Sequence, residues 1–244
     1  MNKLMTHIVA GYPDMQTSEE LVNIMDRVGV SFVEIQIPFS DPVADGPTLM
    51  GAQQVALENG TTPEDVFQLT ERLQKTVKVP LLFMTYFNVV HSYGVEAFCK
   101  RAGELGVYGL IVPDMPMEEE QNEHYLSACK RQGLHAIQII SPLTPRERLK
   151  KIAKVASGFV YCVSREGVTG SGTELNPNLS NYLHTVRQYI DIPIALGFGI
   201  STRDHVLSAL ESSDIAVIGS AVVDVYNKEK KLAEVEDFLT EIMR

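Results

Sequence analysis

No stretch of the sequence reaches the roughly 18 consecutive apolar residues that a membrane-spanning helix requires. The N-terminal residues run directly into a Tyr-Pro-Asp turn at 12–14, without the long apolar region and small-residue cleavage site of a signal peptide. We therefore expect a cytoplasmic protein that neither spans nor binds a membrane.

Positive charge is also scarce, because 21 Lys and Arg residues stand against 31 Asp and Glu residues, a formal net charge of −10. A field of that sign repels phosphate backbones and anionic lipids, which excludes nucleic acid as a partner. A small anionic ligand stays possible, since the backbone N–H groups at a helix N-terminus bind phosphate locally.

Cysteine is rare, and the three residues present, Cys99, Cys129 and Cys162, are an odd number without short spacing. This pattern predicts neither a disulfide framework nor a zinc site. The six histidines are scattered and form no HExxH motif, so we expect no metal and interpret each histidine as structural or exposed.

What the sequence does contain is a repeated alternation of short apolar runs and longer segments with helical periodicity. The eight runs are THIVAG, SFVEIQI, PLLFMT, YGLIVP, HAIQIIS, GFVYCVS, PIALGFG and IAVIGS. Runs that are apolar throughout are typical of parallel strands buried on both faces. Eight strand–helix units predict an α/β fold, a (β/α)₈ TIM barrel in a single domain over residues 1–244. A doubly wound open sheet is the alternative.

Local signals mark where several helices begin and end. Glycines that precede the next strand predict left-handed helix ends at Gly29, Gly106 and Gly133. Thr17 or Ser18 is the predicted N-cap of the first helix, and Thr62, followed by proline, is the predicted N-cap of a later one. The segment 48–60 predicts an added helix after the second strand.

Glu34 stands in the middle of the second apolar run. Strand alternation places Glu34 and Gln36 on one face and Val33 and Ile35 on the other. The polar face would line the barrel interior, where little water solvates a charge, and burial there suits a carboxylate for general acid/base chemistry. The alternative is a glutamate neutralised by a buried Lys or Arg, but no strand supplies one.

An acidic loop follows that strand and carries Asp41 and Asp45 between three prolines. Taken alone, Asp41 is typical of a turn or N-cap, and Asp45 of an Asp-Gly turn. A second carboxylate within reach of a strand end that already carries Glu34 favours a catalytic interpretation.

Two glycine-containing turns follow the seventh and eighth strands, over 196–202 and 218–223. Loops at these places form the usual phosphate site of TIM barrels. The predicted phosphate-binding residues are Gly197, Gly199, Gly219 and Ser220. The Gly-rich segment 164–175 follows the sixth strand and is either filler or a lid over a substrate.

The segments PFSDPVADGP, MTYFN, REGVTG and GFGIS, in this order, resemble the tryptophan synthase α subunit family over essentially the whole chain. The resemblance implies retro-aldol cleavage of indole-3-glycerol phosphate to indole and glyceraldehyde 3-phosphate in L-tryptophan biosynthesis, without metal or cofactor. It also implies a β-subunit partner in an α2β2 heterotetramer.

The same resemblance implies a role for individual residues. Glu34 would be the general acid/base, and Asp45 would accept the hydrogen bond of the indole N–H. The other implied positions are Tyr86, Tyr161 and Thr169 for the substrate pocket and lid, Gly170, Gly199, Gly219 and Ser220 for the phosphate, and Asp41, Pro42 and Asn88 for the face toward the β subunit.

Two departures from the family pattern bear on these roles. Gln36 stands where the family usually has glycine, and we expect it to hydrogen-bond Glu34 or narrow the pocket, with low basal activity and strong activation by the β subunit. The chain also begins almost at the first predicted strand, THIVAG at 6–11, and we expect it to lack the extra N-terminal helix of many members. A stand-alone lyase, a weakly active β-subunit-binding activator and a phosphosugar isomerase-like barrel are the alternative functions.

Overall fold

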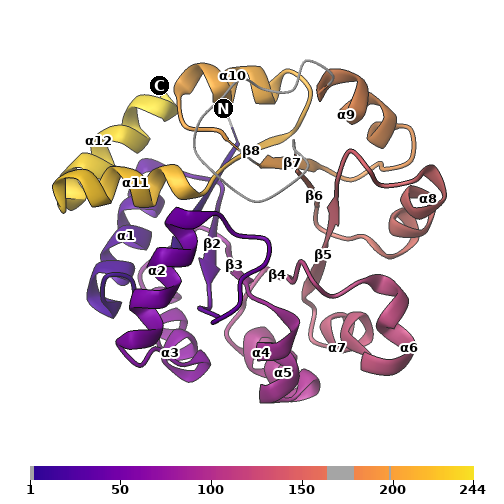
Figure 1. Cartoon of the computed structure of the whole chain (residues 1–244), viewed down its shortest axis with the longest axis horizontal. Coiled ribbons are helices and arrows are strands. Elements are labelled where there is room, and N and C mark those ends of the chain that lie inside the picture. Colours follow the sequence, from indigo (N-terminus) through magenta and orange to yellow (C-terminus); the bar gives the residue numbers. More distant parts are fainter. Residues whose placement is uncertain (1–2, 164–178, 198) are drawn as a thin grey trace.

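A closed barrel of eight parallel strands forms the centre of the computed structural model, which describes residues 3–163, 179–197 and 199–244 (Figure 1). Each strand pairs with the next, and the last pairs with the first. The strands are β1 (Leu4–Val9), β2 (Phe32–Gln36), β3 (Leu81–Met84), β4 (Gly109–Ile111), β5 (His135–Ile140), β6 (Val160–Val163), β7 (Ile194–Gly197) and β8 (Ile215–Ile218). All eight overlap the predicted apolar runs, although β1 begins two residues before its run, so the TIM barrel is confirmed and the open sheet is excluded.

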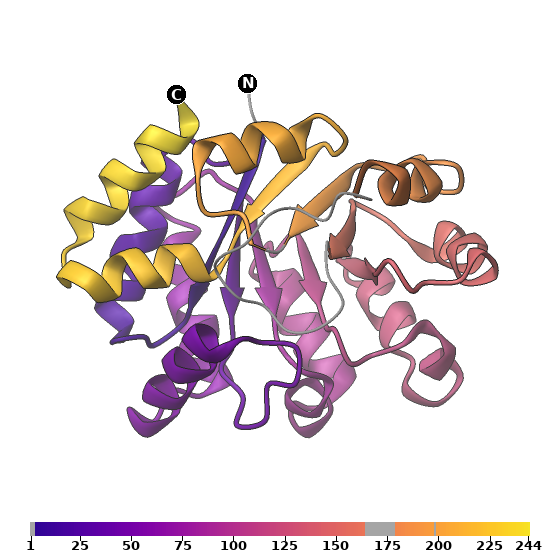
Figure 2. The same cartoon turned by 45° about the horizontal axis from the view of Figure 1, so that its top comes forward.

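Helices surround this barrel on its outer face (Figures 1 and 2). They are α1 (Met15–Val28), α2 (Pro47–Glu58), α3 (Pro63–Leu73), α4 (Phe87–Tyr93), α5 (Val95–Glu104), the short 3₁₀ helix η1 (Met117–Glu119), α6 (Glu120–Glu123), α7 (Tyr125–Arg131), α8 (Arg146–Val155), α9 (Leu179–Arg187), α10 (Arg203–Leu210), α11 (Ser220–Glu229) and α12 (Leu232–Met243). α2 is the added helix predicted over 48–60. In the described chain β1 is the first element.

The predicted helix ends at glycine are confirmed, because Gly29, Gly106 and Gly133 have φ values of 89°, 68° and 71°. These left-handed conformations cost a glycine little and turn the chain toward the next strand. Thr62 is confirmed as the N-cap of α3, where it forms a capping box with Asp65.

The predicted N-cap of α1 is wrong. Asp14, three residues before Thr17, caps this helix and accepts a 2.7 Å hydrogen bond from the Thr17 backbone N–H. Ser18 is instead buried inside the first turn, where its hydroxyl donates to the Asp14 carbonyl. The helix begins at Met15, so the extended residue that precedes it is Asp14, and Thr17 and Ser18 lie within its first turn.

The two faces of β2 separate the core from the site, as the alternation predicts. Val33 and Ile35 are fully buried between the barrel and its helices. Glu34 and Gln36 point into the barrel interior. The lower interior is filled by apolar side chains that include Met5, Leu82, Phe159, Ala195 and Ile215. This packed floor confines the polar residues to the C-terminal ends of the strands.

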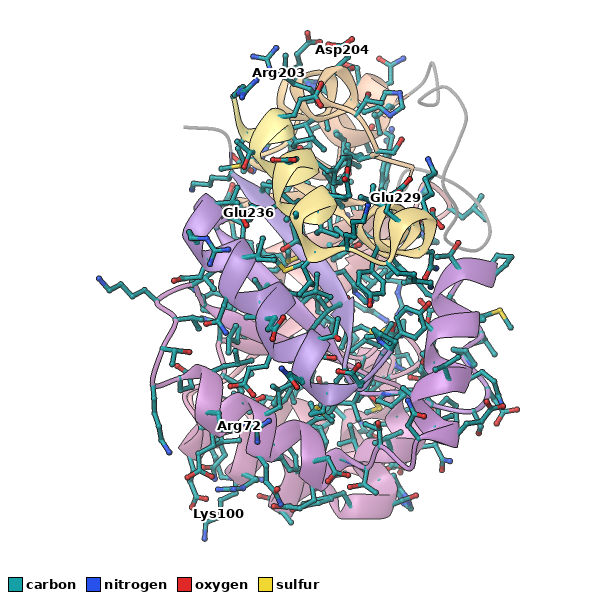
Figure 3. The ribbon with its side chains drawn as sticks, turned by 90° about the vertical axis from the view of Figure 1, so that its left-hand side faces the viewer. Arg72, Lys100, Arg203, Asp204, Glu229 and Glu236 are labelled. Carbon is teal, nitrogen blue, oxygen red and sulfur yellow. The ribbon has the colours of Figure 1, made fainter. Side chains whose placement is uncertain are left out.

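Charged side chains such as Arg72 and Glu236 lie on the outside of the helices (Figure 3). Ion pairs there link neighbouring helices. Arg27 of α1 binds Glu236 of α12 at 2.9 Å, and Arg72 of α3 binds Glu19 of α1 at 2.8 Å. These pairs are exposed and screened by salt, so the buried apolar core contributes far more to the stability of the barrel. Within the described residues, no helix combines the length and the apolar character needed to cross a bilayer.

Candidate active site

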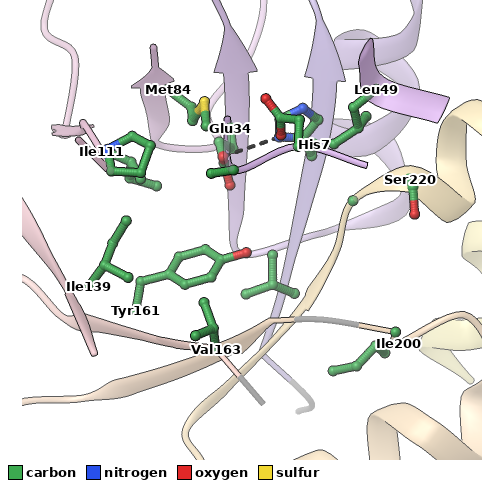
Figure 4. A pocket seen from close by; sticks show the side chains of 16 residues that line it. His7, Glu34, Leu49, Met84, Ile111, Ile139, Tyr161, Val163, Ile200 and Ser220 are labelled. Carbon is green, nitrogen blue, oxygen red and sulfur yellow. Dashed lines mark ion pairs between the residues drawn. The ribbon is translucent and has the colours of Figure 1, made fainter. Parts of the chain in front are cut away.

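A cavity of about 260 Å³ opens at the C-terminal ends of the strands (Figure 4). Its walls are mainly apolar, with a few polar groups that converge from different elements. The lining residues are His7, Glu34, Ala44, Asp45, Leu49, Met84, Ile111, Pro113, Ile139, Tyr161, Val163, Gly199, Ile200, Val217, Gly219 and Ser220. An apolar cavity with a few directed polar groups is typical of a small-molecule site.

Glu34 extends from β2 into this cavity and is only 4% exposed. Its Oε1 atom lies 3.1 Å from Nδ1 of His7. Its Oε2 atom is buried and has no hydrogen-bond partner among the described residues. One carboxylate oxygen is therefore held by the protein, and the other is left for a ligand.

His7 was missed by the sequence interpretation, which treated every histidine as structural or exposed. It lies on β1 directly opposite Glu34 in the strand register, and Figure 4 shows the two side chains joined across neighbouring strands. Burial lowers the pKa of His7, but the adjacent Glu34 carboxylate and the more distant Asp45 raise it, and the net result is a raised pKa. The basic group that meets Glu34 is therefore a histidine, whereas the sequence interpretation had considered only Lys and Arg as partners.

Asp45 is buried and is held by several donors on a single oxygen. Its Oδ2 atom accepts hydrogen bonds from Gln36 Nε2 at 2.7 Å, from the Tyr86 hydroxyl at 2.8 Å and from Gln53 Nε2 at 3.0 Å. Buried carboxylates need such donors, since an unpaired buried charge is costly. The loop carboxylate therefore has a fixed position beside the cavity.

Gln36 does not hydrogen-bond Glu34, so that expectation is wrong. Its amide donates to Asp45, and its Oε1 atom lies 3.0 Å from Nε2 of His7. Two residues of a strand span roughly 6.6 Å along its axis. The amide therefore reaches sideways to β1 and forward to the loop rather than back to Glu34.

Gln53 of α2 is a second residue that sequence reasoning missed. Besides holding Asp45, it accepts a 3.2 Å hydrogen bond from the Phe39 backbone N–H at the start of the acidic loop. The Tyr86 hydroxyl likewise accepts from Ala44 N–H at 3.0 Å. The side chains of α2 and of the β3–α4 connection thus fix the loop from both sides.

Tyr86 and Tyr161, both predicted for the pocket, differ in placement. Tyr86 is fully buried behind Asp45 and stacks on Phe39, outside the cavity lining. Tyr161 lines the cavity and extends from β6 across from Glu34 (Figure 4). Burial, with the carboxylates nearby, raises the pKa of both hydroxyls far above the ordinary value, so both stay protonated.

Of the residues predicted for the phosphate, Gly199 lines the cavity after β7, and Gly219 and Ser220 line it where α11 begins. Gly219 is the N-cap of this helix, and no described side chain caps it. A Cβ atom added at Gly219 would meet no atom of the described residues within 4 Å, so they leave the cavity open there. Gly197 is placed differently. A Cβ atom there would collide with the Tyr161 ring, so the lack of a side chain at Gly197 makes room for Tyr161.

The remaining predicted positions that the structure describes lie outside the cavity lining. Thr169 and Gly170, with the whole segment 164–175, fall outside the described residues. Asp41 and Asn88 are exposed, whereas Pro42 is buried. Over the described ranges, no group of three His, Cys, Asp or Glu side chains is arranged to hold a metal ion.

Comparison with known proteins relates this arrangement to one family. Residues 1–243 match the family model described as tryptophan synthase alpha chain. The tryptophan synthase alpha chain of Syntrophotalea carbinolica is 43% identical over 236 residues, which cover 97% of this chain and 92% of the relative. A solved tryptophan synthase from Mycobacterium tuberculosis superposes with a TM-score of 0.91 at 29% identity, covering 99% of this chain and 91% of that chain. A mutant tryptophan synthase alpha-subunit from Pyrococcus furiosus gives 0.90 at 30% identity, with 99% and 97% covered.

Proposed function

The chain belongs to the tryptophan synthase alpha chain family, and from that premise we propose that Glu34 and Asp45 perform its reaction in the cavity described above. The protein is a lyase of L-tryptophan biosynthesis that cleaves indole-3-glycerol phosphate to indole and glyceraldehyde 3-phosphate. The observation that carries the residue assignment is that two buried carboxylates from β2 and its loop meet in one apolar cavity.

The lining of the cavity divides into two parts that suit the two ends of the substrate. The apolar side chains of Leu49, Met84, Ile111, Ile139, Val163, Ile200 and Val217 favour the indole ring. The N-terminus of α11 at Gly219 and Ser220, with Gly199 beside it, suits the phosphate, since free backbone N–H groups and the helix dipole attract an anion. We assign Gly170 to the same phosphate site and Thr169 to the lid by family resemblance alone.

Glu34 is the proposed general acid/base. Cleavage of the bond between indole C3 and the glycerol chain requires a proton on C3 and loss of the proton from the adjacent hydroxyl. The Oε2 atom of Glu34 is buried without a described protein partner, which leaves it available for both transfers. The Oε1 atom stays on His7.

Asp45 is the proposed acceptor of the indole N–H. Positive charge develops on the indole ring when C3 is protonated, and a fixed carboxylate beside N–H stabilises that transition state. The three hydrogen bonds described above all go to Oδ2. Oδ1 is therefore the oxygen that we assign to the indole.

A tryptophan synthase β subunit is the proposed partner, in an α2β2 assembly. The exposed side chains of Asp41 and Asn88 belong to the proposed face. Val43, two residues after Asp41 in the same loop, is 74% exposed and is an apolar group that a partner would cover. We also propose a cytoplasmic location, because the buried Cys99 and Cys129 sulfurs lie 3.8 Å apart as free thiols.

The test is indole release from indole-3-glycerol phosphate by the purified chain, measured with and without a cognate β subunit. We expect cleavage by the chain alone and faster cleavage in the complex. Indole release that is equal in both conditions would favour a stand-alone lyase. Release that depends wholly on the partner, and survives Glu34→Gln, would contradict the assigned site.

A further inference from the structure

A continuous chain of buried hydrogen bonds joins the two carboxylates. Glu34 Oε1 lies 3.1 Å from His7 Nδ1, His7 Nε2 lies 3.0 Å from Gln36 Oε1, and Gln36 Nε2 lies 2.7 Å from Asp45 Oδ2. All four side chains are buried. In such surroundings the position of each proton matters, because an unpaired donor or two facing lone pairs are costly.

The direction of this chain is fixed from its Asp45 end. An ionised carboxylate only accepts hydrogen bonds, so the Gln36 amide must present its NH₂ group to Asp45 and its oxygen to His7. The amide oxygen in turn only accepts. Nε2 of His7 must therefore carry a proton.

The nitrogen that faces Glu34 then has two favourable states. Either Nδ1 also carries a proton, as an imidazolium beside a carboxylate, or Nδ1 is bare and accepts a proton from the neutral Glu34 acid. Both states hold one proton between the two side chains. Without that proton, a nitrogen lone pair would face a buried carboxylate at 3.1 Å.

We propose that His7 is a positioning residue of the active site, which shares one proton with Glu34 through Nδ1 and is held in this tautomer by Gln36 and Asp45. Its catalytic meaning depends on the function proposed above. By occupying Oε1, His7 directs Oε2 of Glu34, which has no hydrogen-bond partner among the described residues, to the substrate. The raised pKa of His7 extends the pH range in which the pair keeps its proton.

The groups around His7 support this assignment. Glu34 on β2 and Asp45 in the following loop are its charged neighbours, and Tyr161 on β6 lines the same cavity with a neutral hydroxyl. β8, the other strand paired with β1, contributes only apolar residues over Ile215–Ile218. The described surroundings of His7 therefore contain no competing cation.

The kinetic test compares His7→Asn with the parent over a range of pH. The asparagine amide keeps a donor near the Nδ1 position but does not titrate. We expect kcat to fall about 10- to 100-fold with little change in KM, because the loss is one of orientation. The alkaline limb of the kcat profile should move to lower pH by about one unit. His184→Asn, at an exposed position on α9, is the control and should change neither.

The second test reads the proton directly and does not need turnover. ¹⁵N NMR of the labelled protein, with His7→Asn to assign the signals, should show Nε2 protonated throughout. It should also show an imidazolium that persists above about pH 6.5, which is the ordinary pKa of a histidine side chain. Glu34→Gln should lower the pKa of His7, since burial then lowers it without the opposing effect of the Glu34 carboxylate.

The outcomes separate this inference from the proposed function. A neutral His7 with a bare Nε2, or an alkaline limb unchanged in His7→Asn, would overturn the shared proton. Absence of indole release from the parent would instead contradict the proposed function and leave the NMR result to stand on its own.

Discussion

Gln36 and His7 meet through a 3.0 Å hydrogen bond on neighbouring strands, and the same glutamine amide donates to Asp45 at 2.7 Å. The residue that departs from the family pattern is therefore a bridge between the two halves of the site. Low basal activity was expected from a bond between Gln36 and Glu34. Because that bond is absent, the expectation of unusually strong β-subunit activation loses its physical basis.

Glu34→Gln should abolish most of the cleavage activity while the fold is retained. The amide has the shape of the acid but cannot transfer a proton, and proton transfer contributes about 10²–10⁴ in rate. Steady-state indole release measures the loss, and thermal unfolding checks the fold. Turnover within a few-fold of the parent would remove Glu34 from the role of acid/base.

Asp45→Asn should lower kcat and leave KM nearly unchanged. The amide oxygen still accepts from Gln36, Gln53 and Tyr86, but the charge that stabilises the indole cation is gone. Loss of one such electrostatic group costs about 10²–10³ in rate. Separate kcat and KM values decide the matter, because a pure KM effect would place Asp45 in substrate binding alone.

Gly219→Val should raise KM for indole-3-glycerol phosphate and weaken inhibition by glycerol phosphate. The new side chain would occupy the open space beside the α11 N-terminus where we place the phosphate. Gly51→Ala is the matched control, since it adds a methyl group to an exposed helix position with nothing within 4 Å. Undiminished phosphate competition in Gly219→Val would place the phosphate elsewhere.

The pH dependence of stability should change when His7 is replaced. The folded-state pKa of His7 is raised above its unfolded value, so its contribution is complete below about pH 6.5 and is lost as pH rises through the folded pKa. His7→Asn should therefore cost more free energy of unfolding at pH 6 than at pH 9. Urea unfolding at both pH values measures this difference, and an equal cost would mean that His7 is neutral in the folded protein.

The contrast between Glu34 and His7 shows what local sequence pattern reveals. Glu34 interrupts an apolar strand, and the period of two placed it correctly in the barrel interior. His7 breaks its own strand in the same way, but its importance depends on the register between β1 and β2, which pairs residues 27 positions apart (34 − 7). That register is set by packing of the whole barrel and not by either segment.

The acidic loop was also predicted only in part from the local sequence. Its prolines and carboxylates marked it as a stiff functional segment, which agrees with its fixed position. The residues that fix it come from elsewhere, since Gln53 lies on α2 and Tyr86 follows β3. A glutamine in an amphipathic helix gives no local sign that it faces inward. The predicted N-cap of α1 was wrong because Asp14, Thr17 and Ser18 are all good N-cap residues, and the turn geometry selected Asp14.

Gln53 and Gln54 are adjacent on α2 and provide a matched pair for testing whether α2 holds the catalytic loop. Gln53 is buried, donates to Asp45 at 3.0 Å and accepts from Phe39 N–H at 3.2 Å. Gln54 is exposed and, among the described residues, donates to Glu58 on the same helix alone. Gln53→Ala leaves a buried N–H and a carboxylate with fewer partners, so it should destabilise the protein by about 1–3 kcal/mol.

The same change should lower kcat about tenfold, because Asp45 would lose one of the donors that hold it beside the indole. Gln54→Ala should alter neither stability nor kcat beyond experimental error, since surface substitutions rarely exceed about 0.5 kcal/mol. Urea unfolding and steady-state indole release on the two variants measure both effects. If Gln53→Ala lost stability but kept the parent kcat, Gln36 and Tyr86 would suffice to position Asp45, and α2 would support the fold without supporting catalysis.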